Sequence, residues 1–300
     1  MDRHGPAPSP VRAYAMLGLV MLCWAGNSIV GRAIRDDVAP LTLALLRWSG
    51  ALTIVLPFAW ASLKRDRATI VSHWRAILLL GLLGIAAFNA LLYSGLATTT
   101  ASNALLLQAA VPAAVLIVDR LGFGIRPRAI EGLAVLIGSA GVALIVFRAD
   151  WHALAGFRLN PGDALILASV VVWALYTSLL RKRPAIAPAS FLAVTFAIGV
   201  AAMLPAAATE WVAGRGIAPT PRALAGVAYV AIFPSTIAYA LYNRAVTMVG
   251  PASAGRTIAL LPLFGAVLAA LLLGEPLHAY HAVGMALILA GILLPLWRRT

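Results

Sequence analysis

The chain has 300 residues, of which 62% are hydrophobic and only 11% are charged. Soluble domains are usually nearer to half apolar, with about a quarter of their residues charged, so this composition excludes an ordinary soluble domain. The apolar residues fall in repeated blocks of roughly 20, the length that crosses a bilayer. The composition therefore predicts an all-α polytopic membrane protein.

Ten apolar segments follow one another along the chain. They cover residues 13–33, 40–62, 76–96, 101–119, 129–147, 163–180, 188–208, 223–243, 253–273 and 279–297. The N-terminal MDRHGPAPSPVR resembles the start of a signal peptide, but the apolar run that follows continues to Trp24 without a small-residue cleavage site. We expect a first membrane helix that is retained. The single cysteine, Cys23, allows no disulfide within the chain.

Lys and Arg are distributed unevenly between the two sides of this topology. With the N-terminus inside, sixteen of them flank the helices on the inner side and six on the outer side. Because cytoplasmic loops retain positive charge, we expect both termini in the cytoplasm. This distribution accounts for the net charge of +13 without a nucleic-acid partner, and we predict none.

The two halves of the chain repeat each other at a nearly constant offset. The equivalent pairs, 148 to 150 residues apart, are Trp24 and Trp173, Pro40 and Pro188, Pro57 and Pro205, Tyr93 and Tyr242, Pro112 and Pro262, Gly124 and Gly274, and Gly141 and Gly291. Because five helices is an odd number, the second copy starts on the opposite side of the membrane. We predict ten transmembrane helices as two inverted five-helix repeats, residues 1–150 and 151–300. Inverted repeats are common in secondary transporters, which bind substrate near the midplane between them.

Several stretches resemble a known pattern. These are MLCWAGNSIVGR, PLTLALLRWSGA, LLYSGLATTTASNALLLQAAVPAAVLI and YALYNRAVTMVGPASAGRTIALLPLFGAVLAALLLGEP. Over essentially the whole chain, the halves resemble two EamA-type modules of the drug/metabolite transporter superfamily, most closely amino-acid exporters of the YddG type. The resemblance implies a ten-helix exporter or facilitator in a bacterial-type inner (plasma) membrane. The first copy departs from the pattern, with Gly124-Ile125-Arg126 where the second has Gly274-Glu275-Pro276, which argues against a symmetric role for Glu275.

Ionisable residues are almost absent from the middle of the predicted helices. A charge at the helix centre costs about 2.5–3.5 kcal/mol on insertion scales, so mid-depth charges are the first functional candidates, and Arg47 is the exception. Its guanidinium could bind a substrate carboxylate, or it could snorkel outward or pair with a backbone carbonyl. The resemblance favours a structural role, because the family often has arginine here. The lack of a mid-depth carboxylate favours facilitated transport without an acidic coupling site.

Aromatic and amide residues provide the candidate substrate site. Trp24 and Trp173 lie about halfway along their helices, with Asn27 and Tyr176 three residues further on the same faces. These side chains could line a central cavity that suits zwitterionic or amphipathic molecules, or they could simply pack the core. We prefer neither interpretation at this point.

A second set of polar residues lies on the third, fourth and eighth segments. Asn89 and Tyr93 share one helix face, and their approximate repeat equivalents are Tyr239 and Tyr242. They are binding candidates, with interhelical hydrogen bonding as the alternative. Within ATTTASN, residues 98–100 are expected to form a turn. Asn103 is a candidate for the outer mouth of the path, and Gln108 for a deeper position.

Pro112 and Pro262 are expected well inside the fourth and ninth helices. Each removes a backbone donor and can kink its helix. The kink could act as a hinge that lets half a helix swing, or it could be static. Their repeat equivalence mildly favours the hinge.

The leading hypothesis is a secondary transporter for small metabolites, such as amino acids (aromatic or other) or amphipathic drugs, working by alternating access. The alternatives are a membrane channel and a membrane-embedded enzyme. A channel would show a filter and an enzyme a cluster of reactive residues at one depth. The predicted helix interiors lack such a cluster, and the chain also lacks GxxxxGK[ST], HExxH and CxxC, so we expect no enzyme activity, cofactor or metal. The expected partners are a small-molecule substrate and the lipid bilayer, with a monomer or an oligomer both open.

Overall fold

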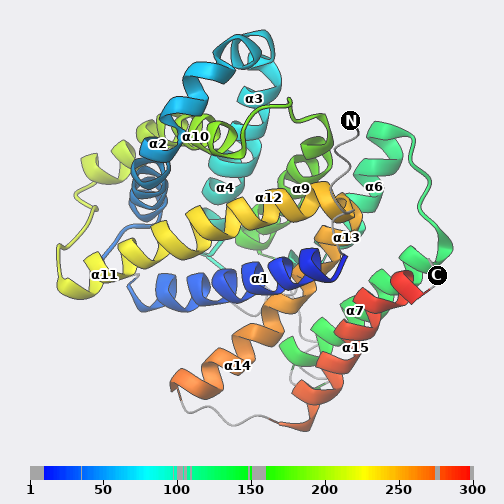
Figure 1. The fold of residues 1–300 in the computed structure, drawn as a ribbon. Coiled ribbons are helices and arrows are strands. Elements are labelled where there is room, and N and C mark those ends of the chain that lie inside the picture. The colour runs from blue at the N-terminus through cyan, green and yellow to red at the C-terminus, as the bar shows by residue number, and fades with distance from the viewer. Residues whose placement is uncertain are drawn as a thin grey trace.

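The structure is a computed structural model of the chain, shown in Figure 1. It describes residues 10–34, 36–96, 98–99, 104, 107–108, 110–147, 149–150, 160–273 and 278–297. Within these ranges every regular element is a helix, apart from one isolated antiparallel bridge between Val38 and Ile217. The all-helical expectation is therefore confirmed for the described residues.

The helices follow one another as the apolar blocks predict. They are α1 (Pro10–Ala33), α2 (Pro40–Ser72), α3 (Trp74–Gly81), η1 (Leu82–Ala87), α4 (Phe88–Leu96), α6 (Val111–Phe123), α7 (Ala129–Val146), α9 (Pro161–Leu179), η2 (Leu180–Lys182), α10 (Pro188–Val212), α11 (Pro221–Val230), η3 (Ala231–Ile237), α12 (Ala238–Val249), α13 (Pro251–Arg256), η4 (Thr257–Leu260), α14 (Leu261–Leu273) and α15 (Ala279–Trp297). The elements η1 and η3 are π-helical, and η2 and η4 are 3-10 helices.

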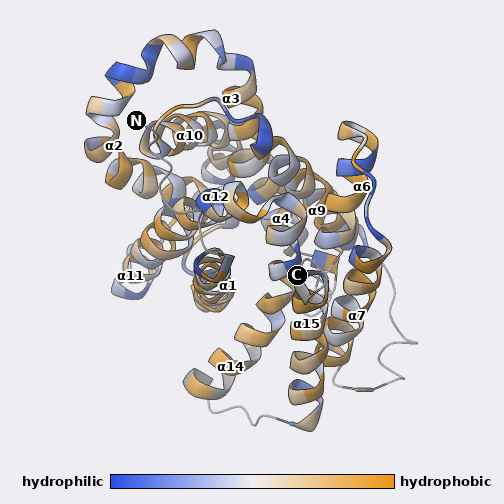
Figure 2. Ribbon diagram, turned by 45° about the vertical axis from the view of Figure 1, so that its right-hand side comes forward, coloured by the Kyte–Doolittle hydropathy of each residue, from blue (hydrophilic) through white to orange (hydrophobic). Residues whose placement is uncertain are grey.

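Six helical runs are long and apolar enough to cross a membrane, and two shorter apolar helices, Ala129–Ile145 and Ala279–Pro295, accompany them. Figure 2 shows hydrophobic residues along most helices and a group of hydrophilic ones where α2 turns into α3. Large apolar side chains face outward, among them Phe58 at 80% and Leu121 at 81% exposed. Such a surface suits lipid rather than water, which supports a multi-pass membrane protein.

The second helix is longer than its apolar block predicts. We expected it to end at residue 62, but α2 continues to Ser72. The added turns contain Lys64, Arg65 and Arg67, which are good helix formers and are exposed. Hydropathy therefore marks where the apolar environment ends, whereas the backbone helix continues for about three more turns.

The main helix contacts join the first half of the chain to the second. The closest associations are α7 with α15, α2 with α10, α4 with α9, and α1 with α12, and Figure 1 shows α7 beside α15 and α1 beside α12. The backbones of α7 and α15 touch at two glycines. A Cβ on Gly141 would lie 2.6 Å from the Gly284 carbonyl oxygen, and one on Gly291 would lie 2.6 Å from that of Ala134. Only glycine allows this approach.

Two π-helical turns interrupt equivalent helices. The first, η1, starts at Leu82, and the second, η3, starts 149 residues later at Ala231. A π-turn leaves backbone carbonyls without their usual helical donors and is frequent at functional sites. Both turns face the buried centre of the molecule, where the candidate site lies.

Candidate functional site

Arg47 lies at the centre of the site. Its side chain projects from α2 and is only 4% exposed. Its Nε donates to the Ser235 hydroxyl of η3 at 2.5 Å, and its Nη1 donates to the Tyr93 hydroxyl of α4 at 2.9 Å. Longer contacts of 3.4 and 3.5 Å join Nη1 to the amide oxygens of Asn27 and Asn89. Four helices thus meet at one guanidinium.

All of these partners are neutral side chains. Two other arginines pair with acids: Arg181 with Asp119 at 2.5 Å, and Arg256 with Glu131 at 4.0 Å. The half-buried Arg183 instead lies over the Phe191 ring, with its guanidinium 5.1 Å from the ring centroid. No described carboxylate lies within ion-pair distance of Arg47, and its Nη2 donates to no described residue. The expectation that this arginine snorkels outward or binds a backbone carbonyl is wrong, because it points inward to side-chain oxygens.

An aromatic cluster lies beside Arg47. The rings of Trp24 and Trp173 meet edge to face with centroids 5.2 Å apart. Tyr239 contacts both of them and also Trp48, at 4.8 Å, while the Arg47 guanidinium lies 4.8 Å from the Trp48 ring centroid. The structure therefore brings the predicted tryptophans together, and Tyr239 and Trp48 connect them to Arg47.

The remaining members of the cluster are joined by ring contacts. Tyr242 lies 5.2 Å from Trp24 and 5.4 Å from Trp173, and Tyr176 lies 5.2 Å from Trp173. Phe88 packs on Trp173 at 4.6 Å. Because these rings contact one another directly, the cluster is closed in this structure.

The tyrosines of the cluster also bond between helices. Tyr176 donates to the Asn243 amide oxygen at 2.7 Å, and the hydroxyls of Tyr242 and Thr177 lie 3.1 Å apart. Tyr239 donates to the carbonyl of Gly84 at 2.8 Å. The interhelical bonding that we expected as the alternative role is present, and it leaves the binding role a prediction.

Backbone carbonyls of the two π-turns enter this network at equivalent positions. Gly84 in η1 accepts from Tyr239, and Pro234 in η3, 150 residues later, accepts from the Trp24 indole at 3.0 Å. The symmetric counterpart of Trp24, Trp173, is 2% exposed, and its indole nitrogen has no acceptor among the described residues. The indole nitrogen of Trp48 and the amide nitrogen of Asn243 have no acceptor among the described residues either, so the network contains three buried donors that are not satisfied.

Glu210 closes one end of the α2–α10 pair. The helix α2 starts with Pro40 after Ala39, which has no side-chain oxygen to cap the first turn. Glu210, from the last turn of α10, accepts instead from the backbone nitrogens of Leu41 at 3.0 Å and Thr42 at 2.8 Å. A carboxylate there satisfies orphan donors and complements the positive end of the helix.

Further contacts surround the Glu210 cap. Thr42 donates its hydroxyl to Glu210 at 2.9 Å and accepts from the Trp211 indole at 3.0 Å. The connection after α1 pairs with the connection after α10 through the Val38–Ile217 bridge, and the Ala39 nitrogen donates to the Gly216 carbonyl at 2.8 Å. This end of the pair is held by side chains and by backbone.

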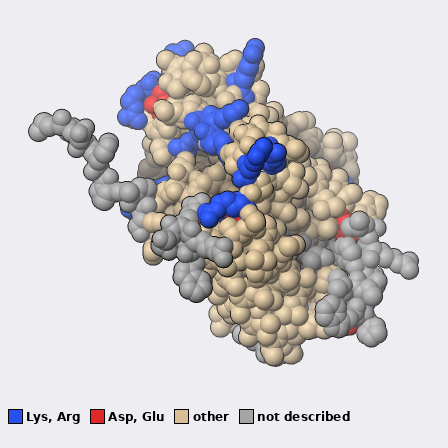
Figure 3. All heavy atoms as spheres, turned by 90° about the vertical axis from the view of Figure 1, so that its right-hand side faces the viewer, with Lys and Arg blue, Asp and Glu red and all other residues tan. Residues whose placement is uncertain are grey.

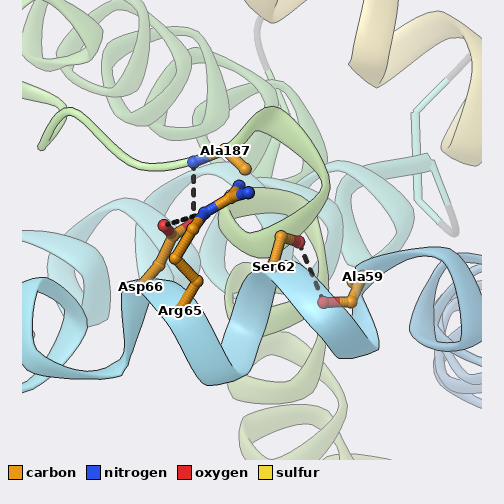
Figure 4. Close-up of polar contacts among 5 residues, drawn as sticks. All are labelled: Ala59, Ser62, Arg65, Asp66 and Ala187. Carbon is orange, nitrogen blue, oxygen red and sulfur yellow. Dashed lines mark hydrogen bonds and ion pairs between the residues drawn. The ribbon is translucent and has the colours of Figure 1, made fainter.

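Asp66 closes the opposite end of the same pair (Figure 4). The helix α10 starts with Pro188 after Ala187, again a residue that cannot cap with its side chain. Asp66 of α2 accepts from the Ala187 backbone nitrogen at 2.8 Å, and Arg65 lies 3.5 Å from the same carboxylate. Each helix therefore supplies an acid to the N-terminus of the other.

The turn at residues 98–99 contacts the start of α9. Asp163 accepts from the backbone nitrogen of Asn160 at 2.8 Å, and Thr99 donates its hydroxyl to the same carboxylate. The hydroxyl run predicted as a turn thus helps to close a helix end. Asp163 and Asn160 therefore form a capping box at the start of α9.

Other predicted residues lie apart from the cluster. Gln108 is half-buried, and no hydrogen bond joins it to another described residue; Asn103 and Glu275 lie outside the described residues. Pro112 was expected well inside a helix, but it occupies the first turn of α6, where its missing N–H is not needed. Pro262, expected well inside a helix too, is the second residue of α14, which begins directly after the 3-10 turn η4. The hinge role stays a prediction.

Three functional candidates were not found from the sequence. Ser235, Glu210 and Asp66 were not singled out. Alanine before Pro40 and before Pro188 is a usable signal, because it leaves both helices without a cap of their own. No comparable pattern identifies Ser235, whose role depends on the π-turn.

Comparisons with known proteins agree with this architecture. The EamA-like transporter family matches residues 11–147 and again 160–297. An uncharacterized transporter of Archaeoglobus fulgidus is 29% identical over 94% of this chain and 96% of its own length. A probable terminal-alkyne amino-acid exporter of Streptantibioticus cattleyicolor is also 29% identical, over 94% and 93%.

A solved crystal structure has the same fold. It covers 97% of this chain and 99% of its own, with a TM-score of 0.78 and 19% sequence identity. The double family match spans nearly all of the chain, and the apolar helices are those of a multi-pass membrane protein. The chain belongs to the EamA-like transporter family.

Proposed function

We propose that this protein is a secondary transporter that moves small metabolites by alternating access between two inverted five-helix repeats, residues 1–150 and 151–300. The reciprocal caps of α2 and α10 carry the proposal. One buried polar and aromatic cluster lies between two closed ends, and each end is held by a carboxylate from the opposite half of the chain. In this arrangement, opening one end at a time would expose the cluster to one side of the membrane.

The charge distribution supports an orientation for these ends. Lys64, Arg65 and Arg67 are exposed beside Asp66, and Figure 3 shows Lys and Arg concentrated on one part of the face in view. Under the positive-inside rule, the Asp66 end is cytoplasmic and the Glu210 end is external. Both chain termini are then cytoplasmic, in a bacterial-type inner membrane.

The transport step follows from the capping geometry. For the outer side to open, α2 must leave Glu210, and the Val38–Ile217 bridge must separate. For the inner side to open, the Asp66 carboxylate must leave the Ala187 nitrogen. The helices on either side stay intact, because their internal hydrogen bonds are not broken. Pro112 and Pro262 are the proposed hinges for the accompanying helix movement.

We infer that amino acids are among the substrates and that the protein acts as an exporter or facilitator. The cluster offers aromatic walls with a few placed polar groups, as small-molecule sites usually do. A relative that is 29% identical is named a probable amino-acid exporter, which supports the same class. Trp24, Asn27, Asn89, Tyr93, Trp173, Tyr176, Tyr239 and Tyr242 are the proposed binding residues, with Asn103 and Gln108 on the path.

Counterflow into proteoliposomes tests the proposal. Liposomes containing the purified protein are preloaded with unlabelled amino acid, and uptake of the labelled compound is followed. A carrier is expected to show faster initial uptake when preloaded, because the return step is made with substrate bound. Equal uptake with and without preloading would indicate a channel, and no uptake of any amino acid, organic acid or amine would contradict transport of small metabolites.

A further inference from the structure

We propose that Arg47 binds a carboxylate group of the substrate, and that the site selects monocarboxylates over amines. This inference rests on the proposed transport function and names its substrate class. It depends on the charge of the central cluster, on the free donors of the guanidinium and on the way the acidic residues of the protein are used.

The first step is the uncompensated charge. Arginine stays protonated in proteins, and Arg47 is 4% exposed and has only neutral partners among the described residues. A buried charge without a counter-ion is costly, and the acid-paired Arg181 and Arg256 show that this chain supplies acids to arginines elsewhere. An anionic ligand would supply the counter-ion that Arg47 lacks among the described residues.

The second step is the geometry of the donors. A carboxylate binds a guanidinium best through two parallel N–H bonds. At Arg47, Nη2 donates to no described residue, and Nη1 makes two of its contacts at 3.4 and 3.5 Å to Asn27 and Asn89. Contacts of this length are at the limit of a hydrogen bond. Nη2 and the second hydrogen of Nη1 are therefore available to a ligand, while Tyr93 binds the first hydrogen of Nη1 and Ser235 holds Nε in place.

The third step is the absence of a binding group for an amine. The buried acids that the structure describes are already used at helix ends: Asp119 pairs with Arg181, Asp163 caps α9, and Glu210 caps α2. None of the described residues that contact the cluster is acidic. An ammonium would meet the Arg47 charge without an opposing carboxylate, so amines and cationic drugs are disfavoured.

The fourth step is the stoichiometry. The two halves of the chain are equivalent at an offset of 148 in this helix, and the residue that corresponds to Arg47 is Thr195. Its hydroxyl bonds within its own helix, to the Phe191 carbonyl at 2.8 Å. Among the described residues, Arg47 is the one cation that hydrogen-bonds at the cluster, which matches one carboxylate. The aromatic rings, with the unsatisfied Trp173 indole, would contact the rest of the ligand.

Matched compounds separate the two chemical groups. On each of three side chains, methyl, isobutyl and benzyl, we would compare the amino acid, the acid without its amino group, and the amine without its carboxylate. Inhibition of counterflow and shift of the melting temperature are measured for each. We expect the amino acids and acids to act and the amines to have no effect up to about a hundredfold higher concentration.

Variants then test the residue. Arg47→Gln is expected to lower the affinity for the acids by about tenfold or more, the scale of a charge-assisted hydrogen bond, and to abolish the preference for acids over amines. Arg47→Lys should keep that preference with reduced affinity. Arg67→Gln, an exposed position on the same helix, is the control and should change neither. A purely structural Arg47 would lower the melting temperature without changing the preference.

The outcomes distinguish the two proposals. The proposal that Arg47 binds a carboxylate would be overturned if amines showed the same counterflow as acids, or if Arg47→Gln kept the preference for acids over amines. Neither result would count against the transport function. Binding of none of the acids would overturn it as well. The absence of counterflow for every compound would instead count against the transport function itself.

Discussion

At the Glu210 end of the α2–α10 pair, both carboxylate oxygens bond to backbone nitrogens, and Thr42, Trp211 and the Val38–Ile217 bridge add further contacts. At the Asp66 end, one oxygen bonds to one nitrogen, beside the exposed Arg65. Glu210 is 4% exposed, so its bonds are shielded from water and salt, which weaken exposed electrostatic contacts. The comparison indicates that the Glu210 end, which we propose to be external, is held closed more strongly than the Asp66 end.

The largest expected effect follows from Glu210→Ala. The Leu41 and Thr42 nitrogens lose their acceptor, and loss of a helix cap costs about 0.5–2 kcal/mol. Opening of the outer end should become easier. Leu41 bonds to Glu210 through its backbone nitrogen, so a cysteine placed there in a Cys23→Ala background keeps the Glu210 cap and the Thr42 hydroxyl. An impermeant thiol reagent added outside should label this cysteine at least about tenfold faster in Glu210→Ala than in the parent.

Glu210→Gln serves as the matched variant, since it keeps the side-chain shape but leaves one oxygen as acceptor. Its labelling rate should lie between those of the parent and Glu210→Ala. If the alanine variant were labelled no faster than the parent, the proposal that Glu210 holds the outer end closed would be refuted.

A smaller effect is expected from Asp66→Ala. Only one bond to Ala187 is lost, and this end is already the weaker one. A cysteine placed at Ala187 can be labelled from the cytoplasmic side in inverted vesicles. Asp66→Ala should raise its labelling rate by a smaller factor than Glu210→Ala raises the labelling rate on the outer side. If the labelling rate rose more here than on the outer side, the Asp66 end would be the stronger of the two. Ser62→Ala, on the same helix, removes only a bond to the Ala59 carbonyl and should have no effect.

The smallest effect is expected from Trp211→Phe. The variant removes the indole donor to Thr42 but leaves Glu210 in place. Trp211 is partly exposed, so the lost bond should cost no more than about 0.5 kcal/mol, the low end for a hydrogen bond. Outer labelling should rise about twofold at most. A change as large as that of Glu210→Ala would mean that the tryptophan, and not the carboxylate, holds this end.

The sequence predicted some of this architecture and missed other parts for physical reasons. The apolar blocks place the helices, and the equivalence of Trp24 and Trp173 predicts that they share a site, because inverted copies bring equivalent helices to one centre. Glu210 was not identified from the sequence. Its partners lie 168 and 169 residues away, a separation over which no periodicity carries information.

Arg47 and Ser235 show the same limit. Hydropathy identifies Arg47 as unusual, but the direction of its side chain depends on packing, and it points inward rather than to the membrane surface. Ser235 reaches it because η3 is π-helical around Pro234. The bulge changes the phase of the helix, so a face assigned from a regular 3.6-residue period would not predict this contact.

Alternating access requires that the outer connections separate in every cycle, and a reversible disulfide tests this most directly. Opposed residues of an antiparallel bridge have Cα atoms about 4.5–5.5 Å apart, which suits a disulfide. With Val38→Cys and Ile217→Cys in a Cys23→Ala background, oxidation is expected to abolish counterflow, and a reductant should restore it. Full counterflow by the cross-linked protein would contradict the proposed mechanism.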